Sequence, residues 1–212
     1  MPMSSIAEIR KDYILRSFNE NDASSDAITQ FDKWWQEAIS SNIPEVNAMT
    51  LATSSADGVP SARIVLLKAY DKNGFVFFTN YNSYKAQQLA ENPRACLVFF
   101  WKEIERQVRI TGIIQKTTEK ISDEYFNSRP EMSRISAIAS PQSKVIESRQ
   151  WLESEVAKVT TSTAVKRPDN WGGYLVRPIT IEFWQGRANR LHDRIQYTLE
   201  ENGGWKMERL AP

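Results

Sequence analysis

The residues best suited to chemistry lie in one stretch near the C-terminus, residues 181–194. This stretch holds the only histidine of the chain, His192, with Arg190 and Arg194 two positions away on either side. On a β-strand, side chains at alternate positions share a face, so these three would project together. Arginine offers a planar fork of donors that suits phosphate or carboxylate, and an imidazole can donate, accept or move a proton. The stretch therefore predicts either a site for a planar, anionic ligand or a solvated basic strand with an incidental histidine.

A second set of cations borders an apolar run. Arg63 and Lys68 enclose the four residues Ile64, Val65, Leu66 and Leu67. A cation at the edge of a core needs an anionic partner. Because the two cations are five residues apart on an expected strand, they point to opposite faces and would serve two anions, or two sides of one groove. The alternative is a strand whose charged ends simply reach solvent.

Weaker candidates for anion binding occur at two expected helix starts. Residues 79–85 run from a strand into a helix, with free backbone N–H groups and Lys85 in the first turn, which suits a phosphate. Gln142 and Ser143, at the start of another expected helix, offer amide and hydroxyl donors. Ordinary helix capping accounts for the same residues, so neither motif is specific.

Two further groups depend on local spacing. Tyr125 and Arg129 are four residues apart on an expected helix and therefore share a face. Ser133 follows after a proline break, so a phenol, a guanidinium and a hydroxyl could converge on a phosphate. Gln107 lies on an expected strand, where its amide could read the edge of a heterocycle or merely decorate the surface.

The elements that must position these residues follow from the hydrophobic periodicity. Helical spacing of apolar residues predicts helices over residues 24–41, 83–91, 118–128, 132–139 and 143–159. A period of two, punctuated by turn residues, predicts strands over residues 48–54, 61–70, 75–79, 94–101, 106–115, 171–177, 180–185, 190–198 and 205–210.

Three of these strands carry continuous apolar runs, at residues 64–67, 75–78 and 97–100. Such runs are typical of strands buried on both faces, as in a closed barrel or a sheet covered by a partner. We therefore predict a mainly β protein with peripheral helices (α+β). Its antiparallel barrel would form a single domain over residues 24–212, after an irregular segment over residues 1–23.

Composition narrows the function classes. The formal net charge of +1 argues against a nucleic-acid binder that depends on a bulk positive field. A single cysteine, Cys96, excludes an intramolecular disulfide and a cysteine-rich metal site, and a single histidine argues against a histidine metal site. No apolar run approaches the roughly 18 residues of a membrane span, and the N-terminus shows no signal-peptide pattern. We therefore expect a cytoplasmic protein with no bound metal.

Taken in order, the motifs resemble the pyridoxine/pyridoxamine 5′-phosphate oxidases, a family of FMN enzymes in vitamin B6 metabolism. The matching blocks are residues 63–68, 78–80, 85–86, 105–108, 125–130, 183–186, 190–194 and 208–212. They span nearly the whole chain, and the last two blocks are highly specific. One position departs from the pattern, because Tyr84 stands where many members carry a second basic residue.

The resemblance implies an FMN-binding split β-barrel of antiparallel Greek-key type, working as a homodimer with FMN sites at the interface. By similarity, the FMN contacts are Arg63, Ile64, Val65, Leu66, Leu67, Lys68, Phe78, Thr79, Lys85, Gln107, Gln142, Ser143, Trp184 and Arg194. The implied substrate contacts are Lys68, Tyr125, Arg129, Ser133, Arg190, Leu191 and His192, with Arg10 and Tyr13 from an N-terminal segment that can fold over substrate as a lid. Arg190 and His192 would be catalytic, the first positioning the reacting carbon C4′ and the second orienting the substrate ring.

The implied reaction is the oxidation of pyridoxine 5′-phosphate or pyridoxamine 5′-phosphate to pyridoxal 5′-phosphate. Molecular oxygen would accept the electrons and give hydrogen peroxide, and the amine substrate would also release ammonia. Two alternatives remain. One is another split-barrel flavoprotein, such as a flavin reductase, which would not need a clamp for a substrate phosphate. The other is a non-catalytic carrier of FMN or pyridoxal phosphate.

Overall fold

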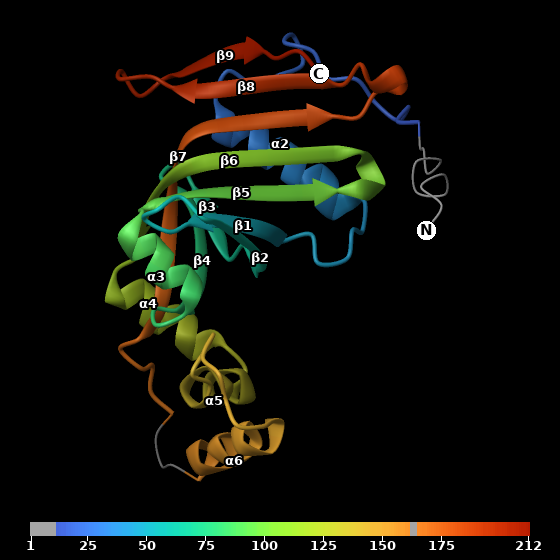
Figure 1. Cartoon of the computed structure of the whole chain (residues 1–212). Coiled ribbons are helices and arrows are strands. Elements are labelled where there is room, and N and C mark those ends of the chain that lie inside the picture. The colour runs from blue at the N-terminus through green and yellow to red at the C-terminus, as the bar shows by residue number, and fades with distance from the viewer. Residues whose placement is uncertain (1–11, 162–164) are drawn as a thin grey trace. The chain divides into compact units, whose positions relative to one another are not determined.

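The computed structural model describes residues 12–161 and 165–212, and Figure 1 shows their helices and strands. The helices are α2 (Ala27–Ser40), α3 (Tyr84–Glu91), α4 (Glu119–Ser128), α5 (Glu131–Ala139) and α6 (Arg149–Thr160), with 3₁₀ turns η1 (Lys102–Ile104) and η2 (Ala188–Arg190). The strands are β1 (Ala48–Ser54), β2 (Pro60–Leu66), β3 (Ala69–Asp71), β4 (Gly74–Asn80), β5 (Arg94–Trp101), β6 (Arg106–Lys116), β7 (Trp171–Gln185), β8 (Asp193–Leu199) and β9 (Trp205–Arg209). Within the described residues, no helix combines the length and the apolar character that a membrane crossing needs.

The strands form a mainly antiparallel sheet. Its order is β2-β1-β5-β6-β7-β4-β3, with β8 paired to β7 and β9 paired to β8. In the first hairpin, the register runs from Ala48 opposite Leu66 to Ser54 opposite Pro60. At the other end of the chain, β8 and β9 run side by side (Figure 1). The prediction of a mainly β protein with helices around antiparallel strands is confirmed.

The chain divides into two compact units. The terminal unit contains the described residues up to Asn47 together with Leu97–Thr111 and Ile179–Pro212. The central unit contains Ala48–Cys96 and the described part of Gly112–Pro178. Strands β5, β6 and β7 contribute residues to both units. A single domain over residues 24–212 stays a prediction.

Helix α2 supplies much of the core of the terminal unit. Asp26 caps its N-terminus, where the carboxylate accepts the Thr29 backbone N–H at 2.7 Å. The apolar face of the helix buries Phe31 and Trp34. Trp34 packs edge-to-face on Phe183 of β7, with ring centroids 5.2 Å apart. The helix thereby fixes β7, the strand that leads into the histidine-bearing loop.

Residues 12–23 form no helix or strand but are packed within the terminal unit. Phe18 is buried, and its backbone N–H donates to the Asp193 carboxylate at 3.0 Å. The Leu15 N–H donates to the side chain of the buried Glu105 at 3.1 Å. The irregular segment predicted at the N-terminus is therefore packed in the part that the structure describes. Its role as a lid stays a prediction.

Strand β4 is a largely buried strand of the central unit. Phe75 and Phe77 are fully buried, and the strand pairs antiparallel with β7. Gly74 is required at its start, because φ is 139° and a Cβ would lie 2.0 Å from the Val176 carbonyl oxygen. The prediction of a strand covered on both faces holds here.

The prediction of a buried strand over residues 61–70 is wrong in two respects. The strand ends at Leu66, and Lys68 donates its backbone N–H to the Val76 carbonyl of β4 at 2.9 Å before β3 begins. Strand β2 also lies at the end of the strand order, so Ile64 is 66% exposed. An apolar run shows that a strand needs a cover, but it does not show that the same chain supplies one.

The two strands predicted over residues 171–177 and 180–185 are one continuous strand, β7. Pro178 lies inside it without disrupting it. The ladder with β4 ends at Val176, and the ladder with β8 begins at Thr180. The proline nitrogen, which cannot donate, therefore falls between these two ladders.

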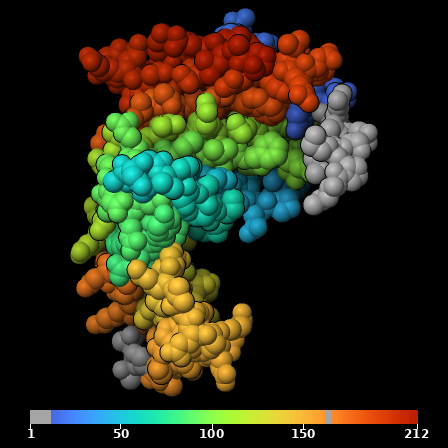
Figure 2. Space-filling view, in the orientation of Figure 1, coloured from blue at the N-terminus to red at the C-terminus, as the bar shows by residue number. Residues whose placement is uncertain are grey.

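Helix α6 begins later than predicted. Ser148 rather than Ser143 caps its N-terminus, because the Ser148 hydroxyl accepts the Trp151 backbone N–H at 3.0 Å. The helix buries no residue, and Figure 2 shows it as the orange segment at the surface beside α5.

Candidate active site

The central unit contains a cavity of about 840 Å³. The residues predicted to contact FMN or the substrate that line this cavity are Arg63, Ile64, Val65, Leu66, Lys68, Phe78, Thr79, Lys85, Tyr125, Arg129, Ser133 and Gln142. They come from β2, β4, α3, α4, α5 and the connecting loops. Leu67 and Ser143 were also predicted, but neither lines the cavity, and Leu67 is buried in the core instead.

Two half-buried cations face the cavity without a carboxylate partner among the described residues. Arg63 Nη1 donates to Thr53 Oγ1 at 2.6 Å, and Lys85 Nζ donates to Gln142 Oε1 at 2.9 Å. Burial, together with the charge of Arg63, lowers the pKa of Lys85 to about 8. Burial also lowers the pKa of Arg63. Uncompensated positive charge beside hydroxyl and amide groups fits a phosphate.

Gln142 reaches this cradle from a loop, not from a helix start as predicted. Helix α6 begins only at Arg149, so no helix N-terminus faces the cavity at this point. The Gln142 side chain instead accepts from Thr79 Oγ1 at 3.1 Å as well as from Lys85. Ser143 follows with a left-handed φ of 70°. The contact is tertiary, and local sequence could not reveal it.

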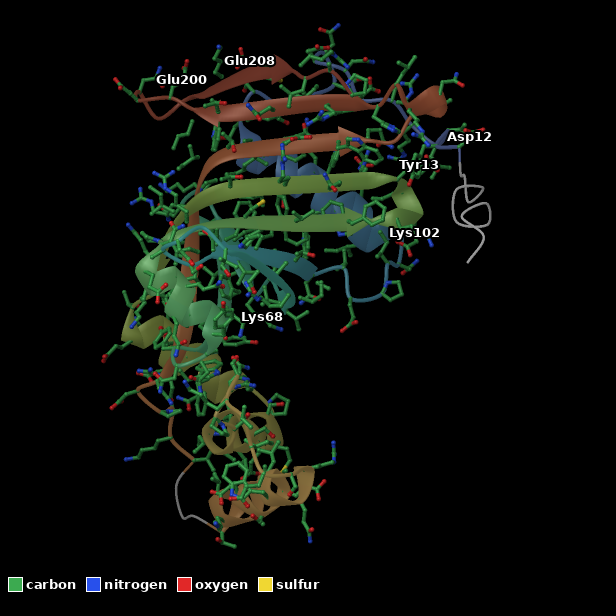
Figure 3. The ribbon with its side chains drawn as sticks, in the orientation of Figure 1. Asp12, Tyr13, Lys68, Lys102, Glu200 and Glu208 are labelled. Atoms are coloured by element: carbon green, nitrogen blue, oxygen red, sulfur yellow. The ribbon has the colours of Figure 1, made fainter. Side chains whose placement is uncertain are left out.

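The predicted phosphate clamp is assembled on the same cavity. Tyr125 of α4 stacks on Phe78 of β4, with centroids 4.0 Å apart and an interplanar angle of 20°. Lys68 Nζ lies 5.9 Å from the centroid of the Tyr125 ring, and Figure 3 labels Lys68. Because β2 ends before Lys68, strand alternation does not separate it from Arg63. Both cations line one cavity, which agrees with the predicted two sides of one groove.

Arg129 carries a donor that needs an acceptor. Its guanidinium carbon lies 4.9 Å from the centroid of the Trp171 ring, and its buried Nη1 has no hydrogen-bond partner. Burial lowers the pKa of Arg129. Since an unsatisfied buried N–H is costly, this position fits an anionic ligand. Sequence reasoning missed Trp171, whose only local signal was an aromatic residue before two glycines at a strand start.

The terminal unit holds a second group, built on aromatic rings. Trp184 packs against the His192 ring with centroids 4.6 Å apart. Tyr13 approaches edge-on, 5.6 Å from Trp184 and 5.9 Å from His192, and Figure 3 shows it beside the β7–β8 connection. A Cβ on Gly186 would lie 2.7 Å from the Tyr13 ring, so only glycine leaves room. The predicted contact Arg10 lies outside the described residues.

The prediction that Arg190, His192 and Arg194 alternate on one strand is wrong. Strand β8 starts at Asp193, and Arg190 ends the turn η2 with a left-handed φ of 62°. A left-handed residue interrupts the pleat, so alternation does not apply across it. Arg194 alone of the three lies on the strand, opposite Trp184 in the register. The loop between β7 and β8 places the other two.

His192 is held in one protonation pattern. Its Nδ1 accepts the Arg187 backbone N–H at 3.1 Å, so the proton of the neutral ring lies on Nε2. Burial and the charge of Arg190 lower the pKa of His192, and Asp193 opposes them. The lowered pKa favours the neutral imidazole, which can donate through Nε2. Leu191 beside it is exposed.

Arg194 is fixed by a buried carboxylate. Its Nε donates to Glu182 Oε1 at 2.9 Å, and Arg109 of β6 pairs with the other oxygen of Glu182. Arg194 Nη1 also donates to the Ala211 carbonyl at 2.7 Å. Gln107, predicted to contact the flavin, is half-buried on β6 two residues before Arg109. Most of the predicted site residues thus fall into two sets, one that lines the central cavity and one that lies in the terminal unit with Trp184 and His192.

Comparisons with known proteins match two parts of the sequence to family models. The sequence model of the family described as pyridoxamine 5′-phosphate oxidase matches residues 35–163. The model described as the pyridoxine 5′-phosphate oxidase C-terminal dimerisation region matches residues 171–212.

Curated relatives match over nearly their whole length. A pyridoxine/pyridoxamine 5′-phosphate oxidase of Nostoc punctiforme is 52% identical over 210 residues, covering 98% of each chain. One of Paraburkholderia phymatum is 53% identical over 212 residues, covering 99% of this chain and all of the relative.

Solved structures give the fold. The structure of PhzG from Burkholderia lata, in complex with tetrahydrophenazine-1-carboxylic acid, has a TM-score of 0.88 at 30% identity and covers 94% of this chain and all of that one. An FMN-binding protein of Nostoc punctiforme, related to pyridoxamine 5′-phosphate oxidase, has a TM-score of 0.72 at 16% identity, covering 86% of this chain and 97% of that one. The predicted split-barrel fold is confirmed. Together, the matches over both parts of the sequence and the full-length relatives show that this chain belongs to the pyridoxine/pyridoxamine 5′-phosphate oxidase family.

Proposed function

We propose that the protein oxidises pyridoxine 5′-phosphate or pyridoxamine 5′-phosphate to pyridoxal 5′-phosphate. The observation that carries the proposal is one cavity lined by two groups of cationic side chains that suit phosphate. Arg63 and Lys85 form one group, and Arg129 with its unpaired Nη1 belongs to the other. One phosphate would come from the cofactor and the other from the substrate.

FMN is the cofactor. Arg63 and Lys85 would hold its phosphate, with Thr79 and Gln142 completing the cradle. The flavin contacts proposed in addition are Ile64, Val65, Leu66, Phe78, Gln107, Trp184 and Arg194. Bound FMN supplies two-electron redox chemistry, with molecular oxygen as the final acceptor, hydrogen peroxide as by-product and ammonia released from the amine substrate.

The substrate phosphate would be held by a clamp made of Lys68, Tyr125, Arg129 and Ser133. Charge-assisted hydrogen bonds to a phosphate are about twice as strong as neutral ones. The free Nη1 of Arg129 gains an acceptor when the phosphate arrives. This clamp grips a part of the substrate that does not react, so its binding energy serves orientation.

Arg190 and His192 would act on the substrate ring. The guanidinium of Arg190 positions C4′ and stabilises charge there. Because Nδ1 of His192 is already an acceptor, Nε2–H would donate to a polar group of the substrate ring. Holding the ring in one orientation is the main contribution of these side chains, and no general base is required for it.

We also propose that the protein is a homodimer with FMN sites at its interface. The match to the family's C-terminal dimerisation region over residues 171–212 supports the dimer. The exposed apolar side chains of Ile64 and Leu66 on the edge strand β2 support a partner-covered surface. A cytoplasmic location stays a prediction from composition.

The likeness to PhzG favours a second candidate, an oxidase that takes a phenazine carboxylate. Such a ligand has no phosphate, so it would offer Arg129 Nη1 a weaker hydrogen-bond acceptor. The test is to purify the protein with its flavin and to add each compound aerobically, measuring pyridoxal phosphate and peroxide. Peroxide with the phenazine compound and none with pyridoxine phosphate would select the second candidate. Binding of pyridoxine phosphate without peroxide would instead indicate a carrier.

A further inference from the structure

Asp193, next to His192, is a meeting point of three segments. Its Oδ2 accepts the Phe18 backbone N–H at 3.0 Å and Arg187 Nη1 at 3.1 Å, and its Oδ1 accepts Arg209 Nη1 at 3.0 Å. The side chain is only 13% exposed. Two guanidinium groups and one backbone amide therefore use both oxygens of one carboxylate, in charge-assisted bonds.

Arg187 links this carboxylate to the imidazole. Its backbone N–H donates to His192 Nδ1 at 3.1 Å, while its guanidinium donates to Asp193. The loop between them contains two left-handed residues, Asn189 with φ 55° and Arg190 with φ 62°. Such conformations are costly for residues other than glycine and persist only where the surroundings hold them. Arg187 precedes these two residues, and its hydrogen-bond partners His192 and Asp193 follow them, so the two contacts tie the ends of the loop together.

We propose that Asp193 is a positioning residue for His192. The carboxylate fixes Arg187, the Arg187 N–H fixes Nδ1 as the acceptor, and Nε2–H is left to face the substrate. The inference rests on the proposed function, because it deepens the role of His192 in that reaction. Asp193 acts through its neighbours and does not need to touch the substrate. The same carboxylate also anchors Phe18, so the N-terminal segment and the imidazole share one support.

The alternative is that Asp193 only stabilises the packing of β8, β9 and the N-terminal segment and has no effect on the imidazole. The two readings differ in what happens to the imidazole. If Asp193 is only structural, its loss lowers stability but leaves the hydrogen bond from the Arg187 N–H to His192 Nδ1 intact. Loss of a positioning residue changes the tautomer of the ring and the turnover number.

The chain offers a direct probe, because His192 is its only histidine. ¹⁵N NMR of labelled protein reports the tautomer and the pKa of this ring without overlap. In the wild type, we expect the Nε2–H tautomer to dominate. In Asp193→Asn, we expect a mixture of tautomers and a lower pKa, because the charge of Asp193 raises the pKa of His192 against the effects of burial and Arg190. Tyr13, Trp184 and the Arg187 backbone N–H face the ring in the wild type.

Kinetics supply the second measurement. We expect kcat for pyridoxine phosphate to fall by roughly tenfold in Asp193→Asn with KM within about twofold, since the ring is misplaced while the phosphate clamp is intact. Arg187→Ala keeps the backbone N–H but removes the ion pair, and it should shift the tautomer in the same direction. This second variant keeps the test valid where Asp193→Asn does not fold.

Two control variants distinguish an effect on the imidazole from a general loss of stability. Arg209→Gln removes the bond to Oδ1 and the pair with Glu20, so it should lower the melting temperature and leave the tautomer unchanged. Asp57→Asn, in an exposed turn of the central unit, should change neither. A wild-type tautomer in both Asp193→Asn and Arg187→Ala overturns the inference. The NMR result needs no pyridoxine phosphate, so it stands or falls apart from the proposed reaction.

Discussion

The arginines of the central cavity differ from those of the terminal unit in whether a carboxylate pairs with them. In the terminal unit, Arg187 pairs with Asp193, and Arg194 pairs with Glu182. In the cavity, Arg63 donates to a backbone carbonyl and hydroxyl groups, and Arg129 keeps a buried N–H without an acceptor. Paired cations hold neighbouring segments in place. Unpaired cations hold positive charge in readiness for an anion that arrives from solution.

The sharpest test of this difference is Arg129→Ala. Removing a charged donor from the substrate phosphate should raise KM for pyridoxine phosphate by about 100-fold and leave kcat within a few fold. Steady-state kinetics measure both. Arg149→Ala, in an exposed pair on α6, is the matched control and should behave as wild type. An unchanged KM in Arg129→Ala would move the clamp elsewhere.

For stability, we expect the larger effect in the terminal unit: loss of a paired charge there should cost more than loss of a cation in the cavity. Glu182→Gln removes the carboxylate shared by Arg109 and Arg194, and we expect the free energy of unfolding to fall by about 2 kcal/mol. Lys85→Met in flavin-free protein should cost less than about 0.5 kcal/mol, because it relieves repulsion with Arg63. Urea unfolding measures both changes. Equal losses in the two variants would remove the distinction between the regions.

The unpaired lysine should also make FMN binding depend on pH. In free protein, Lys85 loses its proton above its pKa of about 8, whereas a bound phosphate favours the charged form and raises that pKa. Binding therefore takes up a proton above pH 8, and the Kd for FMN should rise by roughly tenfold per pH unit there. Flavin fluorescence titrations between pH 7 and about 9.5 measure it. Lys85→Arg keeps its charge throughout and should remove this dependence.

The smallest expected effect concerns the aromatic support of the clamp. Trp171→Leu removes the ring beneath Arg129 and should raise KM for pyridoxine phosphate about fivefold, with little change in kcat. Kinetics on flavin-saturated enzyme measure it, with Trp151→Leu on the surface helix α6 as the control. A larger fall in kcat than rise in KM would show that Trp171 acts on the reacting ring instead.

Local signals predicted the regular elements well. The bounds of β1 and β5 agree with the strands predicted over residues 48–54 and 94–101, since alternation and turn residues act over a few positions. Helical spacing predicted that Tyr125 and Arg129 share a face, and both line the cavity, although Arg129 caps the end of α4 in an extended conformation. Motif resemblance then supplied the remaining assignments, of which those for individual site residues stay predictions.

What the sequence determined is the inventory: which side chains are available for phosphate, for rings and for a proton, and which short segments carry them. Only the tertiary structure decided how they are held. It placed Trp171 under Arg129 and Tyr13 against His192, across separations that no local period can encode. It also replaced the predicted strand around Arg190 by a left-handed loop. The physical reason is that such a loop is stable only when distant groups hold it through hydrogen bonds. Here Phe18 and Arg209 bind Asp193, which in turn binds Arg187 of the loop.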